Sequence, residues 1–305
     1  MLLNKKNDLT EKRIGFIGVG IMGEGMVYKL IETNHKLFVK KNKNPNPINR
    51  VKKKGAVELK TIKEIVKKCE IIILCLPNSS VAKKIILEIS QTCSKKNLII
   101  DCTTNNYNSV LYFKKLSKIY NFNYVEAPIS GGSLQAKNGS LGAFIGSNKK
   151  NFRKAKQILK PCCRKIFRIG KIGMGTKAKL ISNFLALGTT TLVIESLKIA
   201  KKLSINWKKF YKLSSLGSGS SKSLDRIAPK ALKKDYDSYL FTIENTIKDL
   251  NYMIKIFKEY KDIKKITRTL LKFYVKDKKK YGSKAFISNR LKEKIYFLNL
   301  FMLWH

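Results

Sequence analysis

The chain has 305 residues, with 64 Lys and Arg against 20 Asp and Glu, and its formal net charge is +44 at pH 7. This length allows two domains with cores of their own. Only two histidines and six cysteines are present, without a CxxC spacing, which argues against a zinc site and against a histidine acid or base.

Two origins of the positive charge compete. One is the binding of nucleic acid or another polyanion, and the other is a compositional bias toward lysine, asparagine and isoleucine. The lysines are spread along the chain in short clusters, and no basic arm stands out, which favours the bias. We therefore expect no nucleic-acid partner, while the field should still attract anionic substrates and cofactors.

Several features bear on the compartment. Scattered thiols fit a reducing cytoplasm, and the first residues lack the apolar core of a signal peptide. No run of about 18 apolar residues is present, which predicts no membrane-spanning helix. The apolar segment 296–304 is shorter, and we expect it to pack on the chain itself or on a partner subunit. The expectation is a cytoplasmic homodimer or homotetramer.

The first predicted element is a strand at residues 12–17, which runs directly into a glycine-rich turn and then a helical pattern. G-x-G-x-x-G between a strand and a helix is typical of a dinucleotide site. The first glycine permits the tight turn, the second lets a pyrophosphate approach the backbone, and the third lets the helix pack on the strand. The residues expected at the cofactor are Gly18, Gly20, Ile21, Met22 and Gly23.

The second predicted strand covers residues 36–39 and is followed by Lys40-Lys41-Asn42-Lys43-Asn44. An NAD site usually carries an acidic residue near this position, which holds the ribose 2′-hydroxyl. None is present here. A carboxylate would repel a 2′-phosphate, whereas lysine and asparagine suit one, so the sequence favours NADP and leaves NAD possible.

Apolar strands and helices continue to alternate. Strands are predicted at 71–76 and 98–101, and helices around 61–68, 79–90 and 107–120. This pattern is typical of an α/β fold with a doubly wound parallel sheet covered on both faces. Ligands of such sheets bind beyond the carboxyl ends of the strands. We therefore expect Leu76, Pro77 and Thr104 to line one crevice with the glycine turn.

A further strand at 123–126 leads into Ser130-Gly131-Gly132. Two glycines after a serine give a loop of exposed backbone N–H groups, which can bind a carboxylate. A plain turn explains the same residues equally well.

Near the middle of the chain, Lys179 and Asn183 stand four residues apart at the start of a long apolar run. On a helix they share one face, where the lysine can move a proton and the amide can form hydrogen bonds to a substrate. The helix predicted at 175–202 is apolar nearly all round, as a buried helix would be, and should link the domains. Residues 204–305 read as helices. The expected domains are 1–172, an interdomain helix at 173–203, and 204–305.

The chain resembles the β-hydroxyacid dehydrogenase family, which includes 3-hydroxyisobutyrate dehydrogenase and 2-hydroxy-3-oxopropionate reductase. Blocks that match in order are 15–23, 101–104, 126–132 and 173–183, together with Glu195 and residues 248–250. The resemblance implies an N-terminal Rossmann-type sheet, a long interdomain helix and an all-α C-terminal domain. It also implies roles. Lys179 would be the acid/base, and Ser130, Gly131, Gly132 and Asn183 would bind substrate. Phe241 and Lys248 would join the cofactor site.

Some positions depart from the family pattern. Glu126 stands where Asp is usual, Thr103 where Ser is usual, Tyr107 where proline is frequent, Ser182 where a second asparagine is frequent, and residues 281–288 are eroded. These differences concern substrate choice and efficiency rather than reaction type.

The predicted reaction is hydride transfer between a nicotinamide and a small carboxylate-bearing aldehyde or hydroxyacid, without a metal. Two alternatives stay open. One is a non-catalytic dinucleotide- or polyanion-binding protein that kept the fold. The other is an enzyme like 6-phosphogluconate dehydrogenase, against which stand the short chain and Ser182 in place of histidine.

Overall fold

The structure is a computed structural model that describes residues 11–40 and 44–292. The chain divides into two compact units, residues 1–181 and 182–305. The boundary between them falls within one continuous helix, α8 (Met174–Lys202).

Unit 1 is built on a nine-stranded sheet. Its strand order is β3-β2-β1-β4-β5-β6-β8-β7, and β9 pairs with β8. Neighbours from β3 to β6 run parallel, whereas β8 is antiparallel to β6 and β7. The strands are β1 (Arg13–Ile17), β2 (Lys36–Lys40), β3 (Val57–Leu59), β4 (Ile71–Leu74), β5 (Leu98–Asp101), β6 (Asn123–Glu126), β7 (Ile129–Ser130), β8 (Leu141–Gly146) and β9 (Cys163–Gly170).

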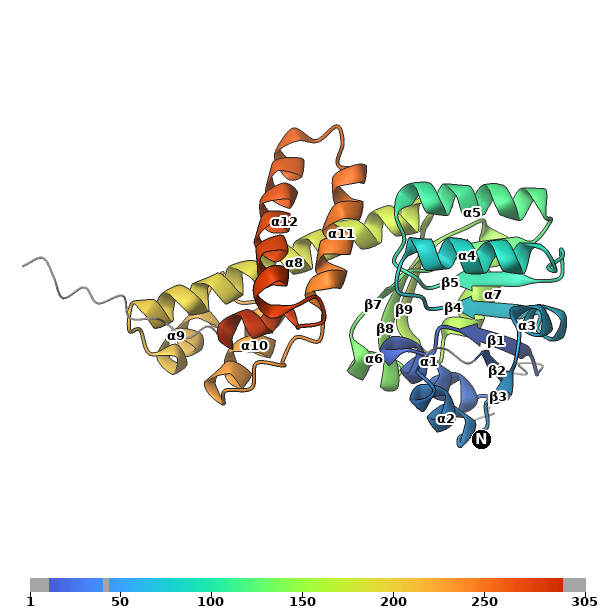
Figure 1. Ribbon diagram of the computed structural model, residues 1–305, viewed down its shortest axis with the longest axis horizontal. Helices are drawn as coiled ribbons and strands as arrows, with labels where there is room; N and C mark the ends of the chain where they lie inside the picture. Colours follow the sequence, from blue (N-terminus) through green and yellow to red (C-terminus); the bar gives the residue numbers. More distant parts are fainter. Residues whose placement is uncertain (1–10, 41–43, 293–305) are drawn as a thin grey trace, which may run out of the picture. The chain divides into compact units, whose positions relative to one another are not determined.

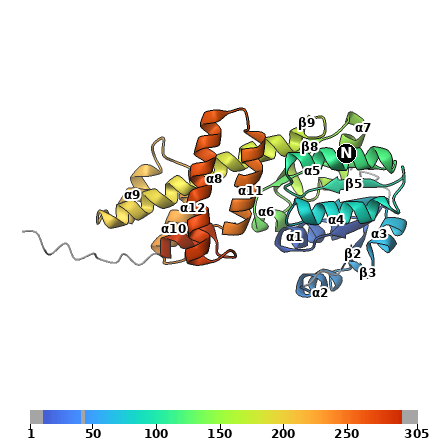
Figure 2. The same ribbon diagram turned by 45° about the horizontal axis from the view of Figure 1, so that its top comes forward.

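Helices cover both faces of this sheet, as predicted for a doubly wound fold. On one face lie α1 (Ile21–Ile31), α2 (Asn46–Lys52), α6 (Ser133–Lys137) and α7 (Lys149–Leu159). On the other lie α3 (Ile62–Lys68), α4 (Ser79–Ser90) and α5 (Tyr107–Ile119), of which α4 and α5 run side by side (Figures 1 and 2).

Alternate residues of each central strand supply the two cores. In β4, Ile71 and Ile73 belong to the first core and Ile72 and Leu74 to the second. Burial on both faces explains why this strand is apolar throughout instead of alternating with polar residues. Helices α3, α4, α5 and α7 begin at side-chain caps. Asn78, for example, accepts a hydrogen bond from the backbone N–H of Val81 at 3.0 Å.

The strand register sets the site. Ile17 pairs with Leu74, Leu74 with Asp101, and Asp101 with Glu126. Four parallel strands therefore end in one row, and the residues that follow them meet at the same edge of the sheet.

Unit 2 is helical. Besides the C-terminal part of α8 it contains α9 (Trp207–Ser214), α10 (Lys222–Leu232), α11 (Ile243–Ile256), α12 (Lys261–Tyr281) and the 3₁₀ helix η1 (Ile287–Lys292). Val193, Ile194 and Leu197 of α8 form its core with Ile227 of α10 and Leu291 of η1. Helices α11 and α12 form an antiparallel hairpin (Figure 1). The α/β fold with a long helix and a helical C-terminal region is thus confirmed.

Helix α8 differs from its prediction in two respects. It is not buried all round, because Leu185, Leu192 and Ile199 are 70%, 69% and 56% exposed. The core of unit 2 covers only the face that carries Val193 and Leu197. In addition, α8 is long and apolar enough to cross a membrane by length and composition, which the sequence reading missed. The core helix of a soluble protein can have the same length and composition.

Candidate functional site

The glycine turn between β1 and α1 has the geometry that a dinucleotide requires. Gly18 has a φ of +105°, and a Cβ there would lie 2.3 Å from the carbonyl oxygen of Cys75. A Cβ on Gly23 would lie 2.1 Å from the carbonyl oxygen of Gly18. By contrast, a Cβ on Gly20 would meet no atom within 4 Å. Two of the glycines are therefore required by packing, and the middle one faces open space.

Helix α1 begins inside this turn. Gly20 is its N-cap and offers no side chain to the first N–H groups, and the N–H of Glu24 makes the first helical bond to the carbonyl oxygen of Gly20 at 2.8 Å. The N–H groups of Ile21, Met22 and Gly23 precede that bond and have no acceptor within the helix. With the helix dipole they form a binding place for an anion, and the open space at Gly20 fits a pyrophosphate.

This geometry distinguishes two alanine substitutions. Gly18→Ala should prevent folding of unit 1 or lower its melting temperature strongly, because the φ and the Cys75 carbonyl both exclude a side chain. Gly20→Ala should fold normally but bind nicotinamide dinucleotides about tenfold or more weakly, since its methyl group would occupy the approach of the pyrophosphate. Thermal melts and cofactor titrations of both variants check this. A folded, normally binding Gly20→Ala protein would contradict the assignment.

The ends of β4 and β5 are tied together by side chains. The N–H of Leu76 donates to Thr103 Oγ1 at 3.1 Å, and the N–H of Asn106 donates to Ser79 Oγ at 2.8 Å. Leu76 also borders the glycine turn, since a Cβ on Gly18 would lie 3.1 Å from its Cδ2 atom. The structure thus brings the glycine turn and the loop after β4 together, and Thr103 joins the loop after β5 to them. Pro77 is exposed and Thr104 is half-buried.

Asp101, the last residue of β5, fixes the loop that follows this strand. It is 1% exposed and accepts hydrogen bonds from the N–H of Thr103 at 3.0 Å, Asn105 Nδ2 at 2.8 Å and Tyr124 Oη at 3.0 Å. Burial raises the pKa of Asp101 to about 6, although these donors act in the opposite direction. Among the described residues, the buried Oδ1 atom of Asn105 has no hydrogen-bond partner. A buried acceptor of this kind beside Thr104 is suited to a ligand or an ordered water.

The loop predicted to bind a carboxylate lies between β7 and α6. Gly131 is exposed and has a φ of +127°. The N–H of Gly132, however, already donates to the side chain of Gln135 at 2.9 Å. The groups left to a ligand are therefore the half-exposed Ser130 side chain and the backbone at Gly131.

Glu126 anchors the start of α8. Its side chain accepts hydrogen bonds from the N–H groups of Gly173, Gly175 (3.0 Å) and Thr176 (3.1 Å), and from Thr176 Oγ1 at 2.5 Å. Glu126 is 1% exposed, and this burial raises its pKa to about 7. A carboxyl group thus caps the N-terminus of the helix that carries Lys179.

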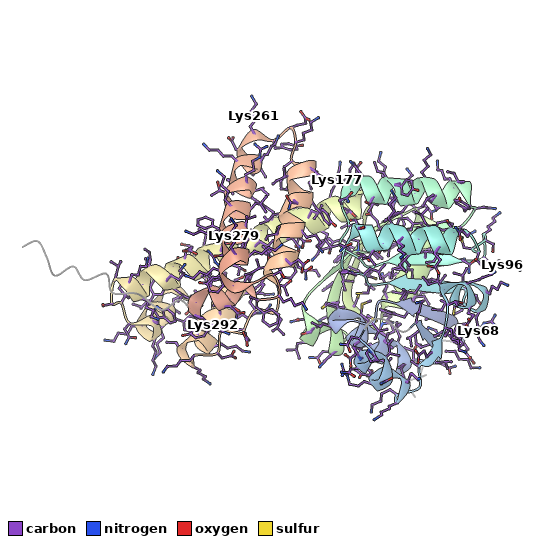
Figure 3. The ribbon with its side chains drawn as sticks, viewed as in Figure 1. Lys68, Lys96, Lys177, Lys261, Lys279 and Lys292 are labelled. Carbon is purple, nitrogen blue, oxygen red and sulfur yellow. The ribbon has the colours of Figure 1, made fainter. Side chains whose placement is uncertain are left out.

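The first turn of α8 also packs directly on the sheet and on α5. A Cβ on Gly175 would lie 2.4 Å from the carbonyl oxygen of Phe144 in β8. Lys177 Nζ lies 4.5 Å from the centre of the Tyr107 ring (Lys177 is labelled in Figure 3). Lys179 is one turn beyond Gly175, on the face turned to β8, and is only 8% exposed. Lys179 is therefore held on a helix whose start is fixed on three sides.

In unit 2, Asn183 meets a buried carboxylate. Its Nδ2 atom donates to Asp249 Oδ2 of α11 at 2.7 Å. Lys248 Nζ lies 3.3 Å from Asp249 Oδ1. Phe241 precedes α11 and is tied to η1, because its carbonyl oxygen accepts from the N–H of Ile287 at 3.0 Å.

The structure therefore groups the predicted residues within each unit. In unit 1 it joins the glycine turn, Leu76 and the loop after β5, and it fixes the helix of Lys179. In unit 2 it joins Asn183 and Lys248. Sequence reasoning gave no role to Asp101, Glu126 or Asp249. A buried acid at the end of a strand is the signal that could have indicated the first two.

In the described part of the chain, neither metal-binding side chains nor exposed lysines are concentrated in one place. Within residues 11–40 and 44–292, no three His, Cys, Asp or Glu side chains could hold a metal ion. Exposed lysines come from many separate elements, as Lys68 of α3, Lys96 of the loop before β5, and Lys261 and Lys279 of α12 show in Figure 3. They do not mark a single basic element.

A doubly wound sheet with this glycine turn defines the chain as a dinucleotide-binding protein. Two family models match it. The NAD binding domain of 6-phosphogluconate dehydrogenase matches residues 13–170, and the NAD-binding domain of NADP-dependent 3-hydroxyisobutyrate dehydrogenase matches residues 173–285. The chain belongs to the β-hydroxyacid dehydrogenase family of NAD(P)-dependent oxidoreductases, as its motifs predicted.

Curated relatives share this family. A probable 3-hydroxyisobutyrate dehydrogenase of Dictyostelium discoideum is 29% identical over 66% of this chain, and the match spans 63% of the relative's length. The 2-hydroxy-3-oxopropionate reductase of Escherichia coli is 24% identical over 80% of this chain and 83% of its own.

Solved structures show the same fold. The 3-hydroxyisobutyrate dehydrogenase of Mycobacterium tuberculosis, solved with L-serine, has a TM-score of 0.82 at 19% identity and covers 93% of this chain and 99% of its own. The 3-hydroxyisobutyrate dehydrogenase of Salmonella typhimurium has a TM-score of 0.83 at 18% identity and covers 92% of this chain and 99% of its own.

Proposed function

We propose that this protein interconverts a short β-hydroxyacid and its semialdehyde with NADP or NAD, as 3-hydroxyisobutyrate dehydrogenase and 2-hydroxy-3-oxopropionate reductase do by their names. The observation that carries the proposal is Lys179. It is a nearly buried lysine, on a helix whose first turn is fixed by Glu126, in a chain with a complete dinucleotide turn. A lysine on a solvated face would need no such anchoring.

The bound nicotinamide would supply or accept the hydride. The protein's own residues then have three tasks. The turn at Gly20 and the N-terminus of α1 hold the pyrophosphate. Ser130 and Gly131 bind the substrate carboxylate through a hydroxyl and backbone groups. Lys179 gives a proton to the substrate oxygen during reduction and takes it back during oxidation, while the amide of Asn183 orients the substrate. No step requires a metal.

Other features belong to the same proposal. Leu76, Pro77 and Thr104 of unit 1 would border the cofactor, and the family resemblance also assigns Phe241 and Lys248 of unit 2 to cofactor binding. The proposed partners are a small carboxylate-bearing aldehyde or hydroxyacid and further copies of the chain, as a homodimer or homotetramer in the cytoplasm. The proposed domains are residues 1–172 and 204–305, with the interdomain helix at 173–203.

The non-catalytic alternative is less well supported. A protein that only binds dinucleotides needs the glycine turn but does not need a nearly buried lysine. Lys179 is 8% exposed, and burying a lysine has a free-energy cost that dinucleotide binding alone does not explain. A sugar-phosphate enzyme like 6-phosphogluconate dehydrogenase is disfavoured by Ser182, which stands where that enzyme has histidine.

We expect NADPH to bind more tightly than NADH. The residues that motivate this are Lys40, at the end of β2, and Lys41, Asn42 and Lys43, which lie outside the described residues. Residues 41–57, which follow β2, contain no Asp or Glu that would repel a 2′-phosphate. Titrating both reduced cofactors against the protein by fluorescence measures the two dissociation constants. A clear preference for NADH would overturn this prediction.

A substrate panel tests the proposed activity. Methylmalonate semialdehyde, tartronate semialdehyde, succinic semialdehyde and glyoxylate all carry a carboxylate near an aldehyde. With NADPH, consumption of the cofactor is followed optically for each compound. Turnover of at least one supports the proposal. No turnover of any, in protein that still binds NADPH, supports the non-catalytic alternative.

A further inference from the structure

We infer that Asp249 is a positioning residue, which fixes the side-chain amide of Asn183 in one orientation and holds Lys248 beside it. The inference rests on the proposed function, since Asn183 is there assigned to the substrate. Asp249 itself is 1% exposed and is not expected to touch a ligand.

The orientation follows from hydrogen-bond chemistry. A carboxylate can only accept hydrogen bonds, so the side of the amide that faces Asp249 must be its NH₂ group. The distance of 2.7 Å from Asn183 Nδ2 to Asp249 Oδ2 is that of a hydrogen bond to a charged acceptor. The Oδ1 atom of Asn183 is consequently turned away from Asp249. It is available to accept a hydrogen bond from an O–H or N–H donor.

The second oxygen of Asp249 lies near a cation, although among the described residues it accepts no hydrogen bond. Lys248 Nζ lies 3.3 Å from Oδ1, and the same ammonium lies 5.8 Å from the centre of the Tyr252 ring. One carboxylate thus contacts two residues that the family resemblance places at the substrate and the cofactor. Because Asp249 is nearly without solvent contact, these interactions are weakly screened.

A second contact links α8 to the residue that ends α11. The rings of Phe184 and Phe257 pack edge to face, with their centres 5.6 Å apart, and so hold α8 against α11. Asn183 and Asp249 therefore form a hydrogen bond between two helices that also touch through these rings. Such a second residue behind a ligand-binding amide is what keeps a site in its productive geometry.

Side-chain NMR tests the contact without any need for turnover. In protein labelled with ¹⁵N-asparagine, loss of a signal in Asn183→Ala identifies the Asn183 amide. We expect Asp249→Asn to shift that signal and to speed exchange of its protons by about tenfold or more. Asp262→Asn, at an exposed site on α12, is the matched control and should leave it unchanged. An unaltered Asn183 signal in Asp249→Asn would overturn the inference.

Folding of the variant does not limit this test. If Asp249→Asn fails to fold, the wild-type protein decides. Its Asn183 amide protons should then exchange about tenfold more slowly than those of the exposed Asn108. Equal exchange rates would contradict a fixed amide.

Kinetics tests the link to the substrate. With whichever acid the panel shows to be turned over, Asp249→Asn should raise KM about tenfold. In the Asn183→Ala background the same change should raise KM less than about twofold, because the residue through which it acts is gone. Effects that multiply would show that Asp249 acts independently of Asn183. If no substrate is turned over but the NMR result holds, the proposed activity fails while the contact between Asp249 and Asn183 stands.

Discussion

Replacing Lys179 with alanine is expected to lower kcat by about 10²–10⁴-fold, the usual contribution of a positioned proton donor. The affinity for NADPH should change little, because the pyrophosphate is held by the glycine turn at Gly20. Steady-state kinetics and a cofactor titration on the same preparation separate the two effects. Near-normal turnover would mean that another group, or solvent, handles the proton.

Two further variants sharpen this test. Lys179→Arg should not restore activity, since a guanidinium keeps its proton at any accessible pH and cannot act as a base. Lys202→Ala lies on the same helix but at an exposed position, so its activity should match that of the wild type. Asn183→Ala should weaken substrate binding and turnover together, because the amide orients the substrate and transfers no proton.

Replacing Glu126 with alanine should lower the free energy of unfolding by roughly 3 kcal/mol or more, since it leaves buried donors without acceptors. Three backbone N–H groups and the Thr176 hydroxyl would lose their partner at once. Turnover should fall as well, because the helix start that positions Lys179 is loosened. Urea titrations at pH 4.5, followed by circular dichroism, measure the loss of stability. A change of less than about 1 kcal/mol would show that water replaces the carboxylate easily.

The same residue predicts a pH dependence. The pKa of Glu126 is raised by burial from its ordinary 4.5 to about 7 in the folded protein. The unfolded chain therefore loses its proton first, and the contribution of Glu126 to stability is full below pH 4.5 and declines as the pH rises to about 7. The free energy of unfolding of the wild type, relative to that of Glu126→Gln, should therefore fall by about 3 kcal/mol between pH 4.5 and pH 8. A difference that is constant with pH would contradict the raised pKa.

The elements predicted correctly are those with a strong local signal. Ile71–Leu74 and residues 98–100 are apolar because both faces of the sheet are covered, and this is visible in the sequence. Strands β3 and β7 to β9 were not predicted. Strand β7 has only two residues. Strand β9 carries arginine and lysine between its apolar residues, because most residues of this strand are exposed. Such strands form because a neighbour is present, which local sequence does not show.

The candidate site was predictable to the same extent. The glycine turn was predictable from its spacing, since Gly18 and Gly23 are required by the adjacent backbone and Gly20 leaves open space for a ligand. The roles of Glu126 and Asp249 were not predictable in this way. Their partners lie far away in the sequence, at Gly173 to Thr176 and at Asn183, so only the folded chain shows what each carboxylate does. The exposed face of α8 was missed because composition does not show which side of an apolar helix finds neighbours.

The continuity of α8 has a mechanical consequence. The boundary between the two compact units falls between Lys179 and Asn183, yet one unbroken helix carries both residues. Their spacing of about 6 Å along the axis comes from helix geometry alone. No rearrangement of the units that leaves the helix intact can alter it. A single residue inserted between them would instead turn the amide by about 100° away from the lysine, so the length of this short stretch is fixed by the two side chains that it carries.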